Sequence, residues 1–182
     1  MMQIVWNREE LERNIRLEKG EFRLLDFWMP VQLYINGVDI TGLDTVPGGD
    51  ISRIDDLFLS IFFAFKSIDP EKLGDKEFYF IGSFEDEVFA GGFKFYIDHD
   101  KQADNLTIRY SNFVHRKFQS ISIPLKQFTE GFLLSTKELL EEVKSIDPAY
   151  CSHEEIVILQ DNMAIIRNWY KERYGSDALL KL

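Results

Sequence analysis

Four strand-like runs follow one another in the middle of the chain, with only short breaks between them. They cover residues 77–82, 88–98, 106–113 and 118–123. In the second run, every second residue from Phe89 to Ile97 is Phe, Gly or Ile, which is the period of a strand with one drier face. Strands this close in sequence predict an antiparallel meander to which the other elements are added.

A hairpin is predicted before the meander. The apolar runs Val31–Ile35 and Val38–Thr41 are joined by Asn36-Gly37. Asn-Gly is the strongest short hairpin signal, because a type I′ turn needs positive φ at both central residues. One more strand is expected over residues 22–29, ending at Pro30.

A short helix and three main helices are predicted from apolar residues that recur at helical spacing. The expected ranges are 7–17 for the short charged helix, which should lie on the surface, then from about 50 or 52 to 66–70, from 124 to about 146, and from 152 to 175. This order predicts an α+β fold: an antiparallel β-sheet, made of the hairpin and the four-strand meander, with three main helices packed on it.

The chain, residues 1–182, fits a single domain, and its tail over residues 176–182 is either loose or docked through its leucines. Asn7 is placed to cap the first helix, and the Ser152-x-x-Glu155 spacing predicts a capping box at the last one. Gly131 is expected to weaken or kink the helix in which it lies. The sequence of Lys66–Pro70 recurs as Lys144–Pro148, which suits a helix stop in both places.

Composition indicates the compartment and the kind of core. Hydrophobic residues make up 45% of the chain and sixteen residues are Phe, which predicts a Phe-rich core. Cys151 is the only cysteine, which excludes an internal disulfide and fits a reducing compartment. The first ten residues have no apolar run typical of a signal peptide, and no run is long enough to span a membrane. We therefore expect a cytoplasmic protein.

The net charge of −10 is concentrated in one stretch. Residues 39–87 carry twelve acidic and four basic residues, a difference of −8, whereas residues 1–38 and 88–182 each differ by −1. The electrostatic field of this negative charge repels phosphate backbones and anionic lipids, so nucleic acid and membranes are disfavoured as partners. A basic protein partner is favoured.

The candidate partner-binding residues are acidic residues of this stretch. They are Asp39 and Asp44 after the hairpin, and Glu85, Asp86 and Glu87 in a turn between two meander strands. Three consecutive carboxylates repel one another, although exposure and salt keep the repulsion small. A positively charged partner would relieve that repulsion.

The loop Asp98–Asn105 has alternating carboxylates, which can converge on a hard cation. Compared with an EF-hand loop, it has Ala103 where glycine is needed for the turn and Arg109 where a bidentate glutamate is needed. We therefore expect a solvated hairpin loop and no bound metal or cofactor. Cys151 and His153 stand together at a predicted helix start, but two residues on one turn rarely supply a nucleophile, a base and an oxyanion site, so an ordinary cysteine is expected.

The layout resembles the small acidic immunity proteins that bacterial polymorphic-toxin and contact-dependent inhibition systems encode beside their toxins. The resemblance consists of size, acidity, the α+β layout and the runs Phe27–Pro30, Tyr34–Gly37 and Gly91–Phe95. It implies a non-catalytic domain that binds a cognate, often basic toxin and blocks its active site, and it assigns no functional residue.

Two other function classes stay open. One is a scaffolding or self-associating module that buries the sheet face not covered by helices. The other is a small enzyme in which Asp98, His99 and His115, with or without Asp100, are brought together by adjacent strands.

Overall fold

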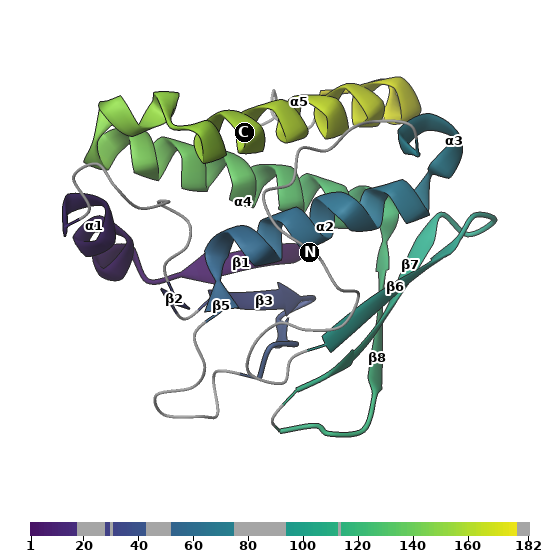
Figure 1. The fold of residues 1–182 in the computed structure, drawn as a ribbon. Coiled ribbons are helices and arrows are strands. Elements are labelled where there is room, and N and C mark those ends of the chain that lie inside the picture. The colour runs from purple at the N-terminus through teal and green to yellow at the C-terminus, as the bar shows by residue number, and fades with distance from the viewer. Residues whose placement is uncertain (18–27, 30, 43–51, 75–93, 113, 178–182) are drawn as a thin grey trace.

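The structure is a computed structural model, and it describes residues 1–17, 28–29, 31–42, 52–74, 94–112 and 114–177 (Figure 1). The strands are β1 (Met2–Trp6), β2 (Trp28–Met29), β3 (Val31–Ile35), β4 (Val38–Asp39), β5 (Ser52–Arg53), β6 (Lys94–Asp100), β7 (Asn105–Ser111) and β8 (Gln119–Pro124). The helices are α1 (Arg8–Leu17), α2 (Ile54–Ile68), α3 (Pro70–Leu73), α4 (Leu125–Ile146) and α5 (Glu154–Tyr174), with a 3₁₀ helix, η3, at Pro148–Ser152.

The α+β class is confirmed, with two three-stranded antiparallel sheets and about four main helices packed on them. One sheet has the order β1-β3-β4 and the other the order β6-β7-β8, while β2 and β5 form a separate short ladder. The hairpin and the meander therefore lie in different sheets, because the hairpin pairs with β1, a strand that the sequence analysis did not predict. The first predicted meander strand, residues 77–82, lies outside the described residues, and the other three correspond to β6, β7 and β8.

The hairpin turn is as predicted. Asn36 has φ of 51° and Gly37 has φ of 79°, so both central residues adopt the positive φ that a type I′ turn needs. The Asn36 side chain also donates to the Ser122 carbonyl at 3.1 Å and accepts from the N-terminal amine at 2.6 Å. The turn thus connects the β1-β3-β4 sheet to β8. Of the strand predicted over residues 22–29, only Trp28 and Met29 are described, in β2.

The core is rich in phenylalanine, as predicted, and forms mainly where α2 meets α4. Phe58, Phe62 and Phe65 of α2 pack against Phe132 of α4, with ring centroids 6.0, 4.7 and 5.8 Å apart. Figure 1 shows α4 and α5 side by side, with α2 close to both. Within the described residues, no helix combines the length and the apolar character needed to cross a bilayer.

The repeated sequence Lys-Ser-Ile-Asp-Pro ends one helix and starts the next in both places. Asp69 and Asp147 each donate their backbone N–H to the carbonyl four residues earlier, at 3.0 Å. Each carboxylate then accepts from the N–H of the following short helix, from Lys72 at 3.4 Å and from Ala149 at 2.9 Å. Proline fits the first helical position that follows.

The capping box predicted for the last helix is wrong, whereas two other helix signals are confirmed. Ser152 belongs to η3 and donates to the Ala149 carbonyl at 2.9 Å, because Asp147 already starts a helical turn there. His153 precedes α5 and makes no side-chain capping bond. Asn7 accepts from the Glu10 N–H at 3.1 Å, and Gly175 ends α5 with φ of 65°. α1 buries Leu11 and Ile15 although it lies near the surface.

Gly131 lies within α4, which is one helix from Leu125 to Ile146. The reason for glycine there is close approach to β1: a Cβ at this position would lie 2.0 Å from the Met2 carbonyl oxygen. A second contact joins the same elements, since Ser135 Oγ accepts from the Ile4 N–H at 3.1 Å. The side of β1 away from β3 is therefore in contact with α4, which removes part of its unpaired edge.

Replacing Gly131 by alanine should destabilise the protein, although alanine favours a helix by about 1 kcal/mol over glycine. Backbone atoms of β1 would have to move to admit the methyl group, at a cost of about 1–3 kcal/mol. Urea unfolding of Gly131→Ala and of the control Gln127→Ala, at an exposed position of α4, measures the difference. A stability increase in Gly131→Ala would show that β1 is not held against α4.

Candidate functional site

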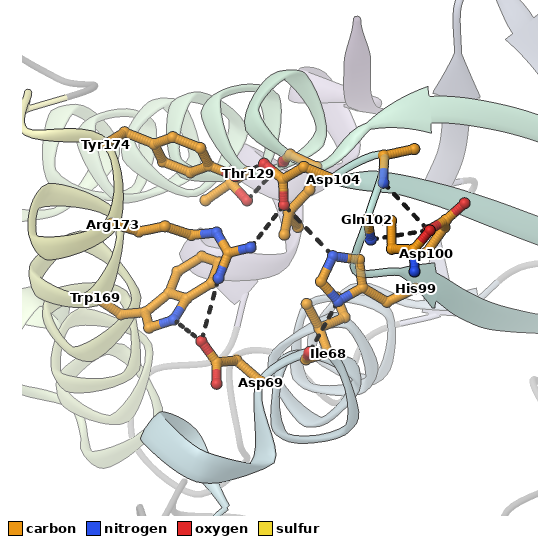
Figure 2. A network of polar contacts seen from close by, with 12 residues as sticks. Ile68, Asp69, His99, Asp100, Gln102, Asp104, Thr129, Trp169, Arg173 and Tyr174 are labelled. Atoms are coloured by element: carbon orange, nitrogen blue, oxygen red, sulfur yellow. Dashed lines mark hydrogen bonds and ion pairs between the residues drawn. The ribbon is translucent and has the colours of Figure 1, made fainter.

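Asp104 is the centre of a polar network where the β6–β7 turn meets the end of α5 (Figure 2). Its backbone has φ of 50°, a left-handed conformation that Asp tolerates. Its carboxylate accepts from Arg173 Nη2 at 2.6 Å and from the Tyr174 hydroxyl at 2.8 Å. Its carbonyl accepts the N–H of Leu125, the first residue of α4, at 3.0 Å. One residue therefore joins the hairpin to two helices.

His99 of β6 lies on the other side of Asp104, with its side chain 5% exposed. Its Nδ1 is 3.0 Å from the Ile68 carbonyl oxygen, and because a carbonyl can only accept, Nδ1 carries the hydrogen. Its Nε2 lies 3.4 Å from Asp104 Oδ1, an ion-pair distance without the alignment of a hydrogen bond. His99 therefore connects β6 to the end of α2.

Asp69, between α2 and α3, completes the network. Its Oδ2 accepts from Trp169 Nε1 at 2.8 Å and lies 3.4 Å from Arg173 Nη1. Arg173 thus bridges the carboxylates of Asp69 and Asp104, as Figure 2 shows. Its guanidinium also lies 5.6 Å from the centre of the Trp169 ring, within cation–π range.

Burial and the contacts within the network shift the pKa values of Asp104, Arg173 and Tyr174. Burial lowers the pKa of the Arg173 guanidinium, but its contacts with Asp104 and Tyr174 outweigh burial, and the pKa is raised overall. Burial raises the pKa of the Asp104 carboxyl, but the hydrogen bonds from Arg173 and Tyr174 outweigh burial, and the pKa is lowered overall. Burial, followed by the hydrogen bond to Asp104, raises the pKa of the Tyr174 hydroxyl. The carboxylate thus stays ionised and the phenol stays protonated at neutral pH, which suits an ion pair and a hydrogen bond that hold the fold together.

The structure does not bring together Asp98, His99 and His115, the residues of the enzyme alternative. Asp98 and His99 are neighbours on a strand, so their side chains lie on opposite faces of the sheet. Asp98 is 59% exposed and pairs with Arg109 at 2.8 Å. His115 is exposed in the β7–β8 loop. Asp100 accepts from the N–H groups of Gln102 and Ala103 within the hairpin turn.

The predicted hairpin loop at residues 98–105 is confirmed, since β6 and β7 pair on either side of a turn at residues 101–104. Within the described residues, no three His, Cys, Asp or Glu side chains gather in a way that could hold a metal ion. Sequence reasoning missed Asp69, Trp169, Arg173 and Tyr174, because no local pattern links residues about 100 positions apart.

Of the five predicted partner-binding residues, Asp39 is the one among the residues that the structure describes. Its carboxylate is half-buried and accepts from the Thr41 N–H at 2.9 Å and from the Thr41 hydroxyl. Burial, and then the charge of Asp39, raise the pKa of Tyr110. Asp39 therefore has a structural role at the end of the hairpin. Asp44, Glu85, Asp86 and Glu87 lie outside the described residues.

A second feature is the loop between β7 and β8, which is anchored by Asn112, a residue that is 2% exposed. Asn112 Oδ1 accepts from the N–H groups of Val114 and His115 at 3.0 and 2.7 Å, and Nδ2 donates to the Ile40 carbonyl at 2.9 Å. The Asn112 N–H also donates to the His115 carbonyl. One buried amide thus fixes the loop and ties it to the end of the hairpin.

Beyond this anchor, residues 114–118 are all exposed. Phe118 is 51% exposed and Val114 45%. The Phe118 ring lies 5.6 Å from that of Tyr96, and Tyr96 lies under the Arg109 guanidinium, also at 5.6 Å. Tyr96 and Arg109 are directly paired across β6 and β7. We name Tyr96, Arg109 and residues 114–118 the outer patch.

Comparison of the chain with protein-family models, with curated proteins and with solved structures finds no match.

Changing Asp104 to Asn should reduce the pH dependence of stability in acid. A pKa lowered by folding adds stability above the pKa of the unfolded carboxyl, about 3.9, and that stability is lost as pH falls through the folded value. The variant should be less stable at pH 7 and lose less stability below about pH 4. Asn keeps the left-handed backbone available.

Urea unfolding at a series of pH values tests this prediction. Asp98→Asn, which removes an exposed ion pair with Arg109, is the control. Its free energy of unfolding should depend on pH in nearly the same way as that of the parent protein. Parallel pH curves for Asp104→Asn and the parent would show that the carboxylate is not held by the network.

Changing Asn112 to Ala should release the β7–β8 loop. The variant leaves the N–H groups of Val114 and His115 and the Ile40 carbonyl without their partner, at a cost of about 1–3 kcal/mol. Hydrogen exchange at residues 114 and 115 should accelerate more than in the rest of the sheet. Gln119→Ala, which removes an exposed hydrogen bond from the first residue of β8 to the Lys117 carbonyl of the loop, should change stability by less than about 0.5 kcal/mol.

Proposed function

We propose that this protein is a non-catalytic, acidic protein-binding domain of the cytoplasm whose partner is a basic protein. A bacterial immunity protein that neutralises a basic toxin is the form of this function that the resemblance suggests. In this proposal neither nucleic acid nor a membrane is a partner, because the net charge of −10 repels both.

The observation that carries the proposal is the concentration of negative charge. Residues 39–87 hold twelve of the 31 acidic residues and four of the 21 basic ones. Complementary charge raises association rates by orders of magnitude, so such a stretch would steer a basic partner toward these acidic residues.

The state of His99 supports a non-catalytic role over the enzyme alternative. This histidine is the one that contacts a network carboxylate, and its Nδ1 hydrogen is committed to the Ile68 carbonyl. Asp104 is in turn committed to Arg173 and Tyr174. A general base needs a nitrogen or oxygen that a substrate proton can reach. His99 Nε2 makes no hydrogen bond, but it is buried against Asp104 in a side chain that is 5% exposed, so a substrate does not reach it in this structure.

Affinity capture from a cell lysate, at low and at physiological salt, tests the proposal. A basic protein should be retained, and its association should slow as salt rises because screening weakens steering. Reversing charge with Glu85→Lys, Asp86→Lys and Glu87→Lys should slow association by about tenfold.

The matched control makes the same change of charge elsewhere. Glu138→Lys, Glu141→Lys and Glu154→Lys replace three exposed acidic residues of α4 and α5. Equal slowing by both triple variants would mean that only net charge matters, and retention of no basic protein at either salt would reject the proposed function.

A further inference from the structure

All of the outer patch except Tyr96 belongs to a part of the chain with charge opposite to that of the whole, and the one described carboxylate paired with the patch is that of Asp98, on Arg109. The longest stretch without an acidic residue runs from Asn105 to Thr129, and it contains Arg109, Arg116, Lys117 and Lys126. The rest of the chain carries all 31 acidic residues. A ligand attracted to this stretch therefore has the opposite charge to one attracted to residues 39–87.

Among the residues that the structure describes, Arg116 has no acidic partner. The other arginines whose side chains the structure describes each lie within 4.0 Å of a carboxylate; they are Arg8, Arg13, Arg16, Arg109, Arg167 and Arg173. No ion pair joins Arg116 or Lys117 to any residue within the described ranges. In so acidic a protein, an exposed arginine without an internal partner is available to an external carboxylate.

Exposed apolar groups stand beside these two cations. Phe118 follows Lys117 directly and packs against Tyr96, and Val114 lies at the other end of the same loop. Arginine and aromatic side chains together are typical of the residues that dominate binding energy at protein interfaces.

The loop is also held in place before any ligand arrives. Asn112 fixes Val114 and His115 through their backbone N–H groups, and Phe118 is held against Tyr96 of β6. A surface ordered in advance loses less conformational entropy on binding, so a small patch can contribute more affinity.

We propose that the outer patch binds an acidic segment of another protein that also carries an apolar side chain. Arg116 and Lys117 pair with carboxylates of the segment, and Phe118 and Tyr96 receive its apolar side chain. This inference goes beyond the proposed function and does not depend on it, since the basic partner would meet a different, acidic part of the chain.

Selection from a random peptide library displayed on phage, with the intact protein as bait, tests the inference. The selected peptides should combine Asp or Glu with an aromatic or aliphatic residue. Fluorescence anisotropy of one synthetic selected peptide then measures affinity. A copy of that peptide with Asn and Gln in place of Asp and Glu should bind at least about tenfold more weakly.

Variants of the patch identify the binding surface. Arg116→Glu with Lys117→Glu, and separately Phe118→Ser, should each weaken binding of the acidic peptide by at least about tenfold. Lys144→Glu with Lys171→Glu makes the same charge change at exposed positions of α4 and α5 and should alter affinity by less than about threefold. All of these positions are exposed, and unfolding curves confirm that each variant is folded.

Several outcomes would overturn the inference. These are selection of basic peptides, selection of no peptide, and peptides that bind the Arg116→Glu, Lys117→Glu variant as well as the parent. A concentration-dependent mass in sedimentation that this variant abolishes would assign the patch to a second copy of the chain. Capture of a labelled single-stranded oligonucleotide through the same residues would assign it to nucleic acid. None of these results bears on capture of a basic partner through Glu85, Asp86 and Glu87.

Discussion

The relative placement of the β6-β7-β8 sheet and the helices depends on the interactions of Asp104. Its backbone makes the left-handed bend that closes the β6–β7 turn, and its carbonyl accepts the first N–H of α4. Its carboxylate binds Arg173 and Tyr174 at the end of α5. Because turn, sheet and two helices meet at one residue, a change there affects every element that the network joins.

Because the β6-β7-β8 sheet is attached to the helices through Asp104, its two faces have different roles. The inner face carries His99 to the end of α2 and adds Leu106, Ile108 and Ile123 to the core. The outer face carries Tyr96 and Arg109, which are exposed. Alternation along a strand separates the residues that hold the sheet in place from those available to a ligand. The binding role proposed for the outer patch therefore needs no disruption of the network.

Local chemistry was predictable wherever a residue's role depended on its immediate neighbours. Asn36-Gly37 forms the expected turn, Asn7 caps α1 and Gly175 ends α5, because each acts on backbone groups a few residues away. The capping box predicted at Ser152 was wrong because Asp147, five residues earlier, starts a helical turn that includes Ser152. Gly131 was predicted to weaken or kink its helix, whereas its role depends on Met2, which lies far away in sequence.

The sequence by itself determined the α+β class, the order of most elements and the distribution of charge, since periodicity, turn residues and ionisable groups are read locally. Only the tertiary structure decided that the hairpin joins β1 in a second sheet, that His99 meets Asp104 and not Asp98 or His115, and that Arg116 has no acidic partner within the described residues. The reason is physical: contacts such as Trp169 with Asp69 join residues about 100 positions apart, and nothing in either local sequence specifies the other.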